Sequence, residues 1–113
     1  MSTAVFPIEI SVHECQRLRT TGEPLLLLDC REPEEFAITS ITGSVLMPMQ
    51  LVPERLAELH SGLSRRIIVH CHHGVRSLQV ARFLRGKGFE FAQSMAGGIE
   101  AWSREIDPLV VRY

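Results

Sequence analysis

The chain has 113 residues, which fits a single domain over residues 1–113, and 45% of them are hydrophobic against 22% charged. A formal net charge of −1 gives no bulk electrostatic drive toward nucleic acid or an anionic membrane surface. No apolar run approaches the ~20 residues of a membrane helix, and no basic region precedes an apolar stretch at the N-terminus, so we expect no membrane segment, no signal peptide and a cytoplasmic location.

Short apolar runs alternate with amphipathic stretches, which is typical of βα units around a mainly parallel sheet. Residues 6–10 alternate in polarity and predict a first strand, and residues 11–18 predict a helix capped by its leading serine. The continuous apolar run Leu25–Leu28 predicts a strand buried on both faces. A short acidic helix over Glu34–Ile38 and a strand over Ser44–Met47 are expected to follow.

The second half continues the same alternation. Leucines at helical spacing predict a helix over 53–60, and Ile67–His70 predicts a second buried strand. The clearest amphipathic helix covers 77–86, with one apolar and one polar arc. A last strand is expected at Phe89–Gln93 and a short helix at Ile99–Arg104, followed by an extended tail.

Charge is unevenly distributed along the chain. Residues 1–60 hold nine acidic and four basic residues, whereas residues 61–113 hold eight basic and four acidic ones. One interpretation is that the two halves form ordinary solvated faces. The other is that the basic second half surrounds an anion-binding site. The second interpretation rests on six basic residues, which are Arg65, Arg66, Arg76, Arg82, Arg85 and Lys87.

The segment IIVHCHHGVRSLQVARFL, residues 67–84, carries the chemistry. It predicts a strand, a six-residue loop from Cys71 to Arg76, and a helix that begins at Ser77. Ligands of open α/β sheets bind at the carboxyl ends of strands, and a helix N-terminus there presents free N–H groups to an anion. Gly74 supplies the backbone freedom for a loop curled around the cysteine sulfur.

A cysteine in such a loop is suited to nucleophilic chemistry. A thiol with a pKa near ~8.5 is mostly protonated at pH 7, but loop amides, the helix dipole and Arg76 favour the thiolate. The thiolate of Cys71 would attack a sulfane sulfur and become a persulfide, whose terminal sulfur the same amides hold. An acceptor would then remove that sulfur in a second displacement.

Three stretches in order resemble the rhodanese homology domain over nearly the whole chain: LLLLDCREPEEFAITSITGSVLMP at 25–48, CHHGVRS at 71–77 and AGGIEAW at 96–102. The resemblance implies an α/β, three-layer rhodanese-like fold with a five-stranded, mainly parallel sheet and helices on both faces. It also implies a thiosulfate sulfurtransferase type of enzyme with Cys71 as its catalytic residue.

The expected substrate-binding residues are those of the loop, which are His72, His73, Gly74, Val75, Arg76 and Ser77. Asp29 and Arg31 are expected to support the site, either as a structural network at a strand end or as substrate contacts. No cofactor is expected. No metal is expected either, because the adjacent His70–His73 residues lack the two-residue ligand spacing of a tetrahedral site.

The chain departs from the family pattern at several positions. Thr39-Ser40 stands where Gly-His is usual, and Thr42 where proline is usual. His72 occupies a position that is often basic in members that use thiosulfate. Cys30 replaces the usual valine, and it is either a small core residue or a partner that resolves a Cys71 persulfide as a disulfide, if the two strand ends are neighbours.

The expected partners are a small-molecule sulfur donor, thiosulfate or a persulfide, and a thiol or cyanide acceptor. An alternative is a sulfur-relay carrier or docking module fed by a protein partner, because the tail resembles rhodanese domains appended to activating enzymes of sulfur-carrier, molybdopterin and thiamine pathways. A monomer is expected for a domain that closes its own core.

A phosphatase and a non-enzymatic binding module are the two alternative function classes. Cysteine-dependent phosphatases also use a cysteine-to-arginine loop, but they place five residues between the two, and here four separate Cys71 from Arg76. A shorter loop makes a smaller cradle, which suits sulfur better than phosphate. A non-enzymatic binding module is the other class, and the presence of Cys71 argues against it.

Overall fold

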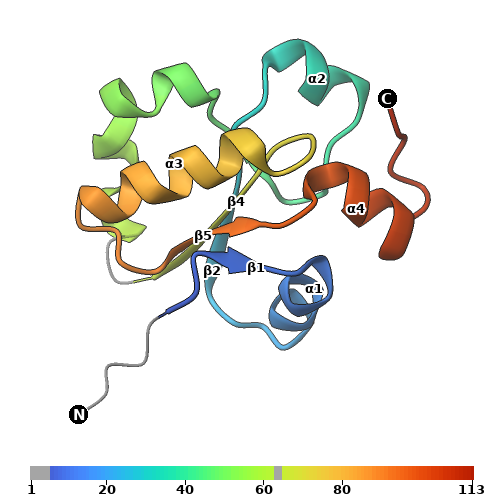
Figure 1. Cartoon of the computed structure of the whole chain (residues 1–113), viewed down its shortest axis with the longest axis horizontal. Coiled ribbons are helices and arrows are strands. Elements are labelled where there is room, and N and C mark those ends of the chain that lie inside the picture. Colours follow the sequence, from blue (N-terminus) through green and yellow to red (C-terminus); the bar gives the residue numbers. More distant parts are fainter. Residues whose placement is uncertain (1–5, 63–64) are drawn as a thin grey trace.

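The computed structural model describes residues 6–62 and 65–113, which form a five-stranded parallel sheet with helices on both faces (Figure 1). The strand order is β1-β5-β4-β2-β3, and each neighbouring pair is parallel. The strands are β1 Glu9–Ile10, β2 Leu25–Asp29, β3 Val45–Leu46, β4 Arg66–His70 and β5 Ala92–Met95. The predicted α/β fold class is confirmed. Residues 1–5, part of the segment where no signal peptide is expected, lie outside the described residues.

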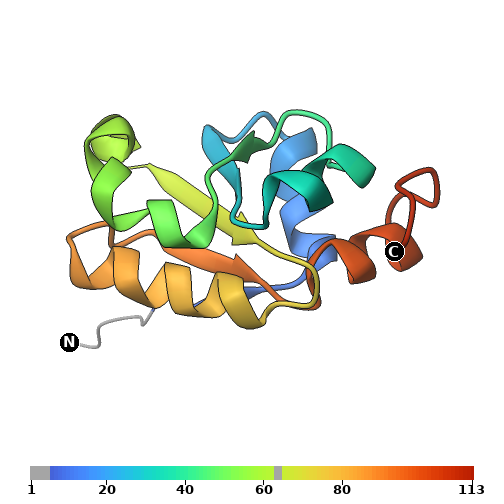
Figure 2. The same cartoon turned by 90° about the horizontal axis from the view of Figure 1, so that it is seen from above.

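Helices cover both faces of the sheet, with one layer above the strands and another below them in Figure 1; Figure 2 shows the same elements from above. The helices of the described residues are α1 Val12–Thr20, α2 Pro33–Ile38, η1 Met49–Leu51, η2 Pro53–Gly62, α3 Val75–Gly86 and α4 Gly98–Glu105, of which η1 and η2 are 3₁₀ helices. The helices α1 and α4 pack on one face, and α3 and the 3₁₀ helices pack on the other. None of the described helices has the length and apolar character needed to cross a membrane.

The two central strands β2 and β4 separate two hydrophobic cores. Leu27 and Ile68 belong to the core under α1 and α4, and their successors Leu28 and Val69 belong to the core under α3. This alternation follows from the two-residue period of a strand. Because both faces are buried, apolar residues fill the strands almost continuously, as the sequence predicts for Leu25–Leu28.

Local capping fixes the beginnings of α1 and α2. The Ser11 hydroxyl accepts the N–H of Glu14 at 3.0 Å, as expected for the predicted capping serine. At α2, the Glu35 carboxylate accepts the N–H of Glu32 at 2.9 Å, and Pro33 occupies the first helical position. These contacts place Glu35 at the carboxyl edge of the sheet, near the segment that follows β4.

Two predicted boundaries and one predicted helix type are wrong. The helix α3 begins at Val75 rather than Ser77, because Gly74 with φ 106° ends the loop two residues early. The segment over 53–60 is a 3₁₀ helix that Arg55 interrupts with non-helical angles. The last strand is Ala92–Met95 rather than Phe89–Gln93, because the residues after α3 complete a turn and the strand itself contains buried polar side chains.

Candidate active site

Cys71 lies directly after β4 at the carboxyl edge of the sheet, with 1% of its surface exposed. The loop that it starts has only four residues before α3. Its last residue, Gly74, has a positive φ, and a Cβ there would lie 3.2 Å from the backbone nitrogen of Gly97. Gly74 is therefore required both for the turn and for the close approach of the segment before α4, and the turn brings the N-terminus of α3 back over the cysteine.

Two backbone amides point at the sulfur of Cys71. The N–H groups of Gly74 and Ser77 donate to its Sγ at 3.1 and 3.3 Å. Ser77 lies in the first turn of α3, where N–H groups have no partner within the helix and the helix dipole is positive. The hydroxyl of Ser77 is 3.5 Å from Sγ and 2.7 Å from the hydroxyl of Ser94 on β5. The arrangement forms a cradle for a negatively charged sulfur.

This cradle lowers the pKa of the Cys71 thiol to about 4. The largest cause is a hydrogen bond from the thiol of Cys30, and the hydroxyl and N–H of Ser77 and the N–H of Gly74 act in the same direction against the effect of burial. Since thiols ordinarily titrate near ~8.5, Cys71 is a thiolate at neutral pH. The thiolate is the nucleophilic form of cysteine.

Cys30 follows β2 and lies beside Cys71. It is fully buried, and its N–H donates to the carbonyl of His70 at 3.0 Å. The hydrogen bond to Cys71, burial and the neighbouring charge raise the pKa of Cys30 far above its ordinary value, so this thiol stays neutral and acts as a donor. Cys30 also belongs to the core under α3. The ends of β2 and β4 are neighbours, and this is the condition under which Cys30 could resolve a Cys71 persulfide as a disulfide.

The N-terminus of α4 closes the cysteine loop from the other side. The N–H groups of Ile99 and Glu100 donate to the carbonyls of Cys71 and His72 at 2.8 and 3.1 Å. Gly98 lies so close to the loop backbone that a Cβ on it would be 2.5 Å from the carbonyl oxygen of Cys71 and 2.4 Å from that of His72. The Gly97-Gly98 pair thus fixes the loop, a role that the sequence analysis did not assign.

The guanidinium of Arg76 is directed at an acidic side chain of α2. It binds both carboxylate oxygens of Glu35 at 2.7 and 3.0 Å, and the hydroxyl of Tyr113 donates to the same carboxylate at 2.8 Å. Arg76 lowers the pKa of Glu35 to about 2 and is the largest cause of that shift. The loop arginine therefore fastens α3 to α2, while amides and hydroxyls surround the sulfur.

Asp29 and Arg31 form a fully buried ion pair. The Arg31 guanidinium donates to both carboxylate oxygens, with the shortest contact at 2.7 Å, and its remaining hydrogens reach the carbonyl of Thr39 at 2.7 Å and the hydroxyl of Tyr113 at 2.9 Å. Both side chains have 0% exposure. This geometry favours the structural network over the substrate contact that the sequence left open.

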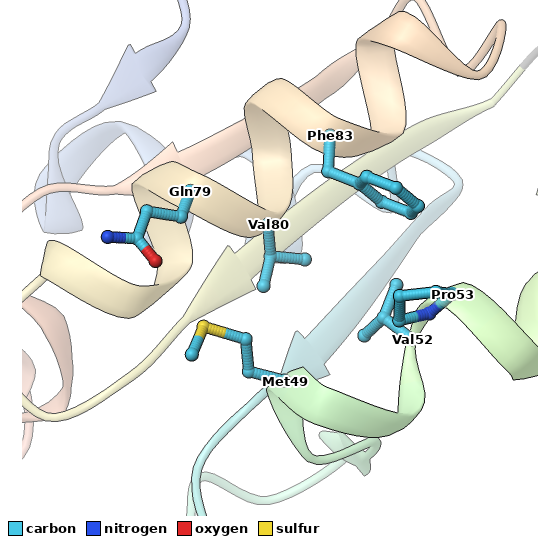
Figure 3. Close-up of a pocket in the computed structure, with 6 residues that line it drawn as sticks. All are labelled: Met49, Val52, Pro53, Gln79, Val80 and Phe83. Atoms are coloured by element: carbon cyan, nitrogen blue, oxygen red, sulfur yellow. The ribbon is translucent and has the colours of Figure 1, made fainter.

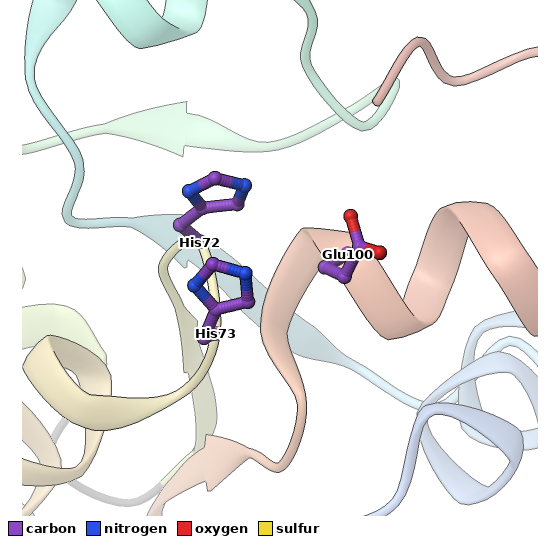
Figure 4. A group of neighbouring side chains, drawn as sticks. All are labelled: His72, His73 and Glu100. Carbon is purple, nitrogen blue, oxygen red and sulfur yellow. The ribbon is translucent and has the colours of Figure 1, made fainter. Parts of the chain in front are cut away.

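His72 and His73 form the rim outside the cysteine cradle. The ring of His72 stacks between His73 and Tyr113, with centroid distances of 3.9 Å on each side. Glu100 approaches these histidines, and ligand atoms of the three residues lie within 4.8 Å of one another (Figure 4). The Glu100 carboxylate is already paired with Arg112, which would compete with a cation there. Val75 is 70% exposed.

Apart from Arg76, the basic residues between positions 65 and 87 whose contacts are described lie away from this site. Arg65 and Arg66 lie at the start of β4, the end opposite Cys71. Arg85 lies near the far end of α3, where its guanidinium donates to the carbonyls of Ala92, Phe6 and Pro7. The interpretation of a basic surround for an anion site is not supported by these positions.

An apolar groove opens beside the core under α3. It has a volume of about 260 Å³ and lies between α3 and the 3₁₀ helices (Figure 3). Its lining residues are Met49, Val52, Pro53, Gln79, Val80 and Phe83. The N–H of Met49 donates to the carbonyl of Cys30 at 3.0 Å, so the groove adjoins the strand end that carries this second cysteine.

Several residues of the site escaped the sequence analysis. Ser94 stands inside a strand that was placed three residues too early, and Tyr113 lies in a tail predicted only as extended. Their contacts to residues 17 and 78 positions away leave no local signal in the sequence. The Gly97-Gly98 pair at the start of α4 could have indicated this contact, because glycine often marks a close approach of two backbones.

The comparisons with known proteins agree with this architecture. The family model described as "Rhodanese-like domain" matches residues 11–105. A "Rhodanese-like Domain Protein" from Staphylococcus aureus has a solved structure that superposes with a TM-score of 0.78 at 27% identity, covering 93% of this chain and 97% of that one. The residues matched by the family model include strands β2 to β5 and the helices from α1 to α4.

Two curated relatives place the match in context. The "Thiosulfate sulfurtransferase GlpE" of Ectopseudomonas mendocina is 34% identical over 82% of this chain and 82% of its own length. The "Adenylyltransferase and sulfurtransferase MOCS3-1" of Zea mays is 36% identical over 88% of this chain, which spans only 22% of that longer protein. By the family model and these identities, the chain belongs to the rhodanese-like domain family.

Proposed function

We propose that this chain is a sulfurtransferase in which Cys71 is the nucleophile and carries sulfur as a persulfide. The observation that supports this most strongly is the cradle around Sγ, where the N–H groups of Gly74 and Ser77 donate at 3.1 and 3.3 Å. Membership of the rhodanese-like family and the sulfurtransferase names of both relatives support the same chemistry.

The first step loads the enzyme. The Cys71 thiolate attacks the outer sulfur of a donor such as thiosulfate, the bond from Sγ to that sulfur forms, and the S–S bond of the donor breaks. Sulfite leaves with the electron pair of the broken bond. The negative charge then rests on the terminal sulfur of the persulfide, next to the same amide donors, which favours the charged product.

The second step removes the sulfur from the Cys71 persulfide. A nucleophilic acceptor, a thiolate or cyanide, attacks the terminal sulfur, and Sγ leaves as the thiolate that the cradle stabilises. Cyanide becomes thiocyanate and a thiol becomes a new persulfide. Because the Cys71 thiol has a pKa of about 4, its thiolate is a good leaving group, and the resting state returns without an external acid.

The remaining loop residues have separate proposed roles. Gly74 and Ser77 bind the transferred sulfur, His72 and His73 line the entrance, and Val75 is exposed at the mouth. Arg76 acts through position, since its guanidinium is occupied by a carboxylate. An occupied arginine and a cradle of two amides support transfer of a single sulfur atom rather than of a phosphoryl group.

The donor defines two versions of the proposal. A small molecule such as thiosulfate is favoured by the name of the bacterial relative. A protein partner in a sulfur relay is the second version, and the maize relative, which joins an adenylyltransferase name to a sulfurtransferase name, supports it. In both versions we propose that residues 1–113 act as one domain, as a monomer, in a reducing compartment such as the cytoplasm.

Thiocyanate formation from thiosulfate and cyanide tests the small-molecule version. We expect steady turnover by the wild-type protein, its loss in Cys71→Ser, and no change in Cys15→Ser, a control cysteine buried in the opposite core. Turnover that survives Cys71→Ser would overturn the proposal. Absence of turnover with thiosulfate, together with loading of sulfur from a cysteine desulfurase and cysteine, would select the relay version.

A further inference from the structure

Cys30 and Cys71 occupy equivalent places on neighbouring strands. Asp29 of β2 is the register partner of His70 of β4, so the two cysteines are the next pair along the sheet. Their side chains point to the same face, because Leu28 and Val69, two residues earlier, are also register partners and lie in the same core. Neighbouring strands lie ~4.8 Å apart, within the ~4.4–6.8 Å Cα separation of disulfides.

The two cysteines share a dry environment. Both residues are at most 1% exposed and belong to the same hydrophobic core, and a hydrogen bond between their thiols is the largest cause of the shift in the pKa of each. The remaining cysteine, Cys15, is buried under α1 on the opposite face of the sheet and cannot reach either of them. Cys30 is therefore the one cysteine of the chain with which Cys71 can form an intramolecular disulfide.

We propose that Cys30 and Cys71 form a redox-active dithiol, in which Cys30 attacks Sγ of Cys71 whenever that sulfur carries a leaving group and closes a disulfide. Cys71 is the reactive thiolate, and Cys30 is the resolving cysteine held beside it. The proposal adds a modification site and a second reacting residue to the sulfur-transfer site.

The first route starts from a hydroperoxide and does not depend on sulfur transfer. The Cys71 thiolate attacks hydrogen peroxide, its sulfur gains a hydroxyl group, and hydroxide leaves as the O–O bond breaks. Cys30 then attacks Sγ of this sulfenic acid. The S–S bond forms, the S–O bond breaks, and the departing hydroxide takes the Cys30 proton as water.

The second route rests on the proposed function. When Cys71 carries a persulfide and no acceptor is present, Cys30 attacks the inner sulfur, Sγ, and the bond to the terminal sulfur breaks. The terminal sulfur leaves with the bonding electrons and the Cys30 proton as hydrosulfide. The persulfide itself supplies the oxidising equivalents, so no further oxidant is consumed.

The disulfide would be a reversible resting state. It removes the nucleophile and therefore stops sulfur transfer, and it also keeps Cys71 from oxidation to the sulfinic acid, which is not restored by thiols. A small thiol returns the pair to the dithiol in two exchange steps, with its own disulfide as the second product. Reduction thus restores the thiolate in its cradle.

The test treats the reduced protein with one equivalent of hydrogen peroxide, alkylates it under denaturing conditions, and determines intact mass and disulfide-linked peptides. We expect a loss of about 2 Da, one alkylated cysteine, and a linked peptide pair that contains Cys30 and Cys71. Thiocyanate turnover should fall in proportion and return after dithiothreitol. Cys15→Ser should give the same linked peptides with no alkylated cysteine.

The variant Cys30→Ser keeps a donor beside Cys71 but cannot form the disulfide. We expect it to gain oxygen atoms, about 16 Da each, and to lose turnover that dithiothreitol restores only in part. Oxygen gain on Cys71 in the wild-type protein without a linked peptide would overturn the proposal. A linked peptide together with a failure to load sulfur would support the dithiol and reject the sulfur-transfer function, so the two failures are distinguishable.

Discussion

Arg76 and Glu35 form a bidentate ion pair, 2.7 and 3.0 Å across, that joins the end of the cysteine loop to helix α2. The hydroxyl of Tyr113 donates to the same carboxylate at 2.8 Å. The arginine therefore holds the first turn of α3 in place, and it is the N–H of Ser77 in this turn that reaches the Cys71 sulfur. Hydrogen bonds from thiol, hydroxyl and amide groups are thus the main stabilisation of the sulfur anion, and the guanidinium adds its nearby charge.

Glu35→Gln is expected to destabilise the protein at neutral pH by on the order of 1–3 kcal/mol. The pKa of Glu35 is lowered to about 2 in the folded state, mainly by Arg76. The ion pair therefore contributes its full stabilisation above the unfolded-state pKa of 4.5, and this stabilisation is lost as the pH falls toward 2. Urea unfolding of both proteins at pH 7 and pH 3 measures this. A difference that stays equal at the two pH values would contradict the ion pair as its cause.

The rate of Cys71 alkylation is expected to follow a titration with a midpoint at about 4, because only the thiolate reacts. Cys30→Val should move the midpoint upward, since it removes the donor that contributes most to the lowered pKa. Ser77→Ala should move it in the same direction, and Cys15→Ser should leave it in place. Iodoacetamide labelling followed by mass spectrometry between pH 3 and 9 gives the profile, and a wild-type midpoint near ~8.5 would refute the cradle.

Gly98→Ala is expected to cost about 2–4 kcal/mol of stability and on the order of 10–100-fold in thiocyanate turnover. The added methyl group would meet the carbonyl oxygens of Cys71 and His72 at 2.5 and 2.4 Å, at a residue with φ 62°. Gly86→Ala is the matched control, because its Cβ meets nothing within 4 Å, and it should be neutral or slightly stabilising. Equal effects of the two substitutions would contradict the role of the α4 N-terminus.

Arg31→Met is expected to destabilise the protein by about 3–5 kcal/mol, because it leaves Asp29 as an unpaired carboxylate in the core. Arg17→Met breaks an exposed ion pair with Glu14, which water and salt screen, and should cost far less stability. Equilibrium urea unfolding compares the two. If Arg31→Met keeps wild-type stability but loses only sulfur-transfer rate, Arg31 contacts the substrate rather than supporting the fold.

Much of the fold could be predicted from the sequence, because its signals are local. The apolar runs of β2 and β4 and the serine before α1 identify those elements directly. The strand β5 was misplaced because Gln93 and Ser94 are buried polar residues, so hydrophobicity does not mark it. The start of α3 was misplaced because a serine in the first helical turn resembles a capping serine.

The site could be predicted only in part. Cys71 and its loop are contiguous in the sequence, so the loop and the helix N-terminus beside it were visible. The neighbourhood of Cys30 depends on the order of strands in the sheet, which no local pattern encodes. Likewise, the partner of Arg76 is 41 positions away, and the sequence analysis therefore directed this guanidinium at the sulfur instead.

The most direct test of the central claim is the intact mass of reduced protein after incubation with thiosulfate. At early times we predict a gain of one sulfur atom, about 32 Da, that is absent in Cys71→Ser and lost on addition of cyanide. Without an acceptor, closure of the disulfide with Cys30 then converts this gain in the wild-type protein into a loss of about 2 Da. The Cys30→Ser variant should retain this gain, since it cannot expel the sulfur as hydrosulfide. No gain in Cys30→Ser, either from thiosulfate or from a desulfurase with cysteine, would contradict Cys71 as the sulfur carrier, and so would a gain that persists in Cys71→Ser.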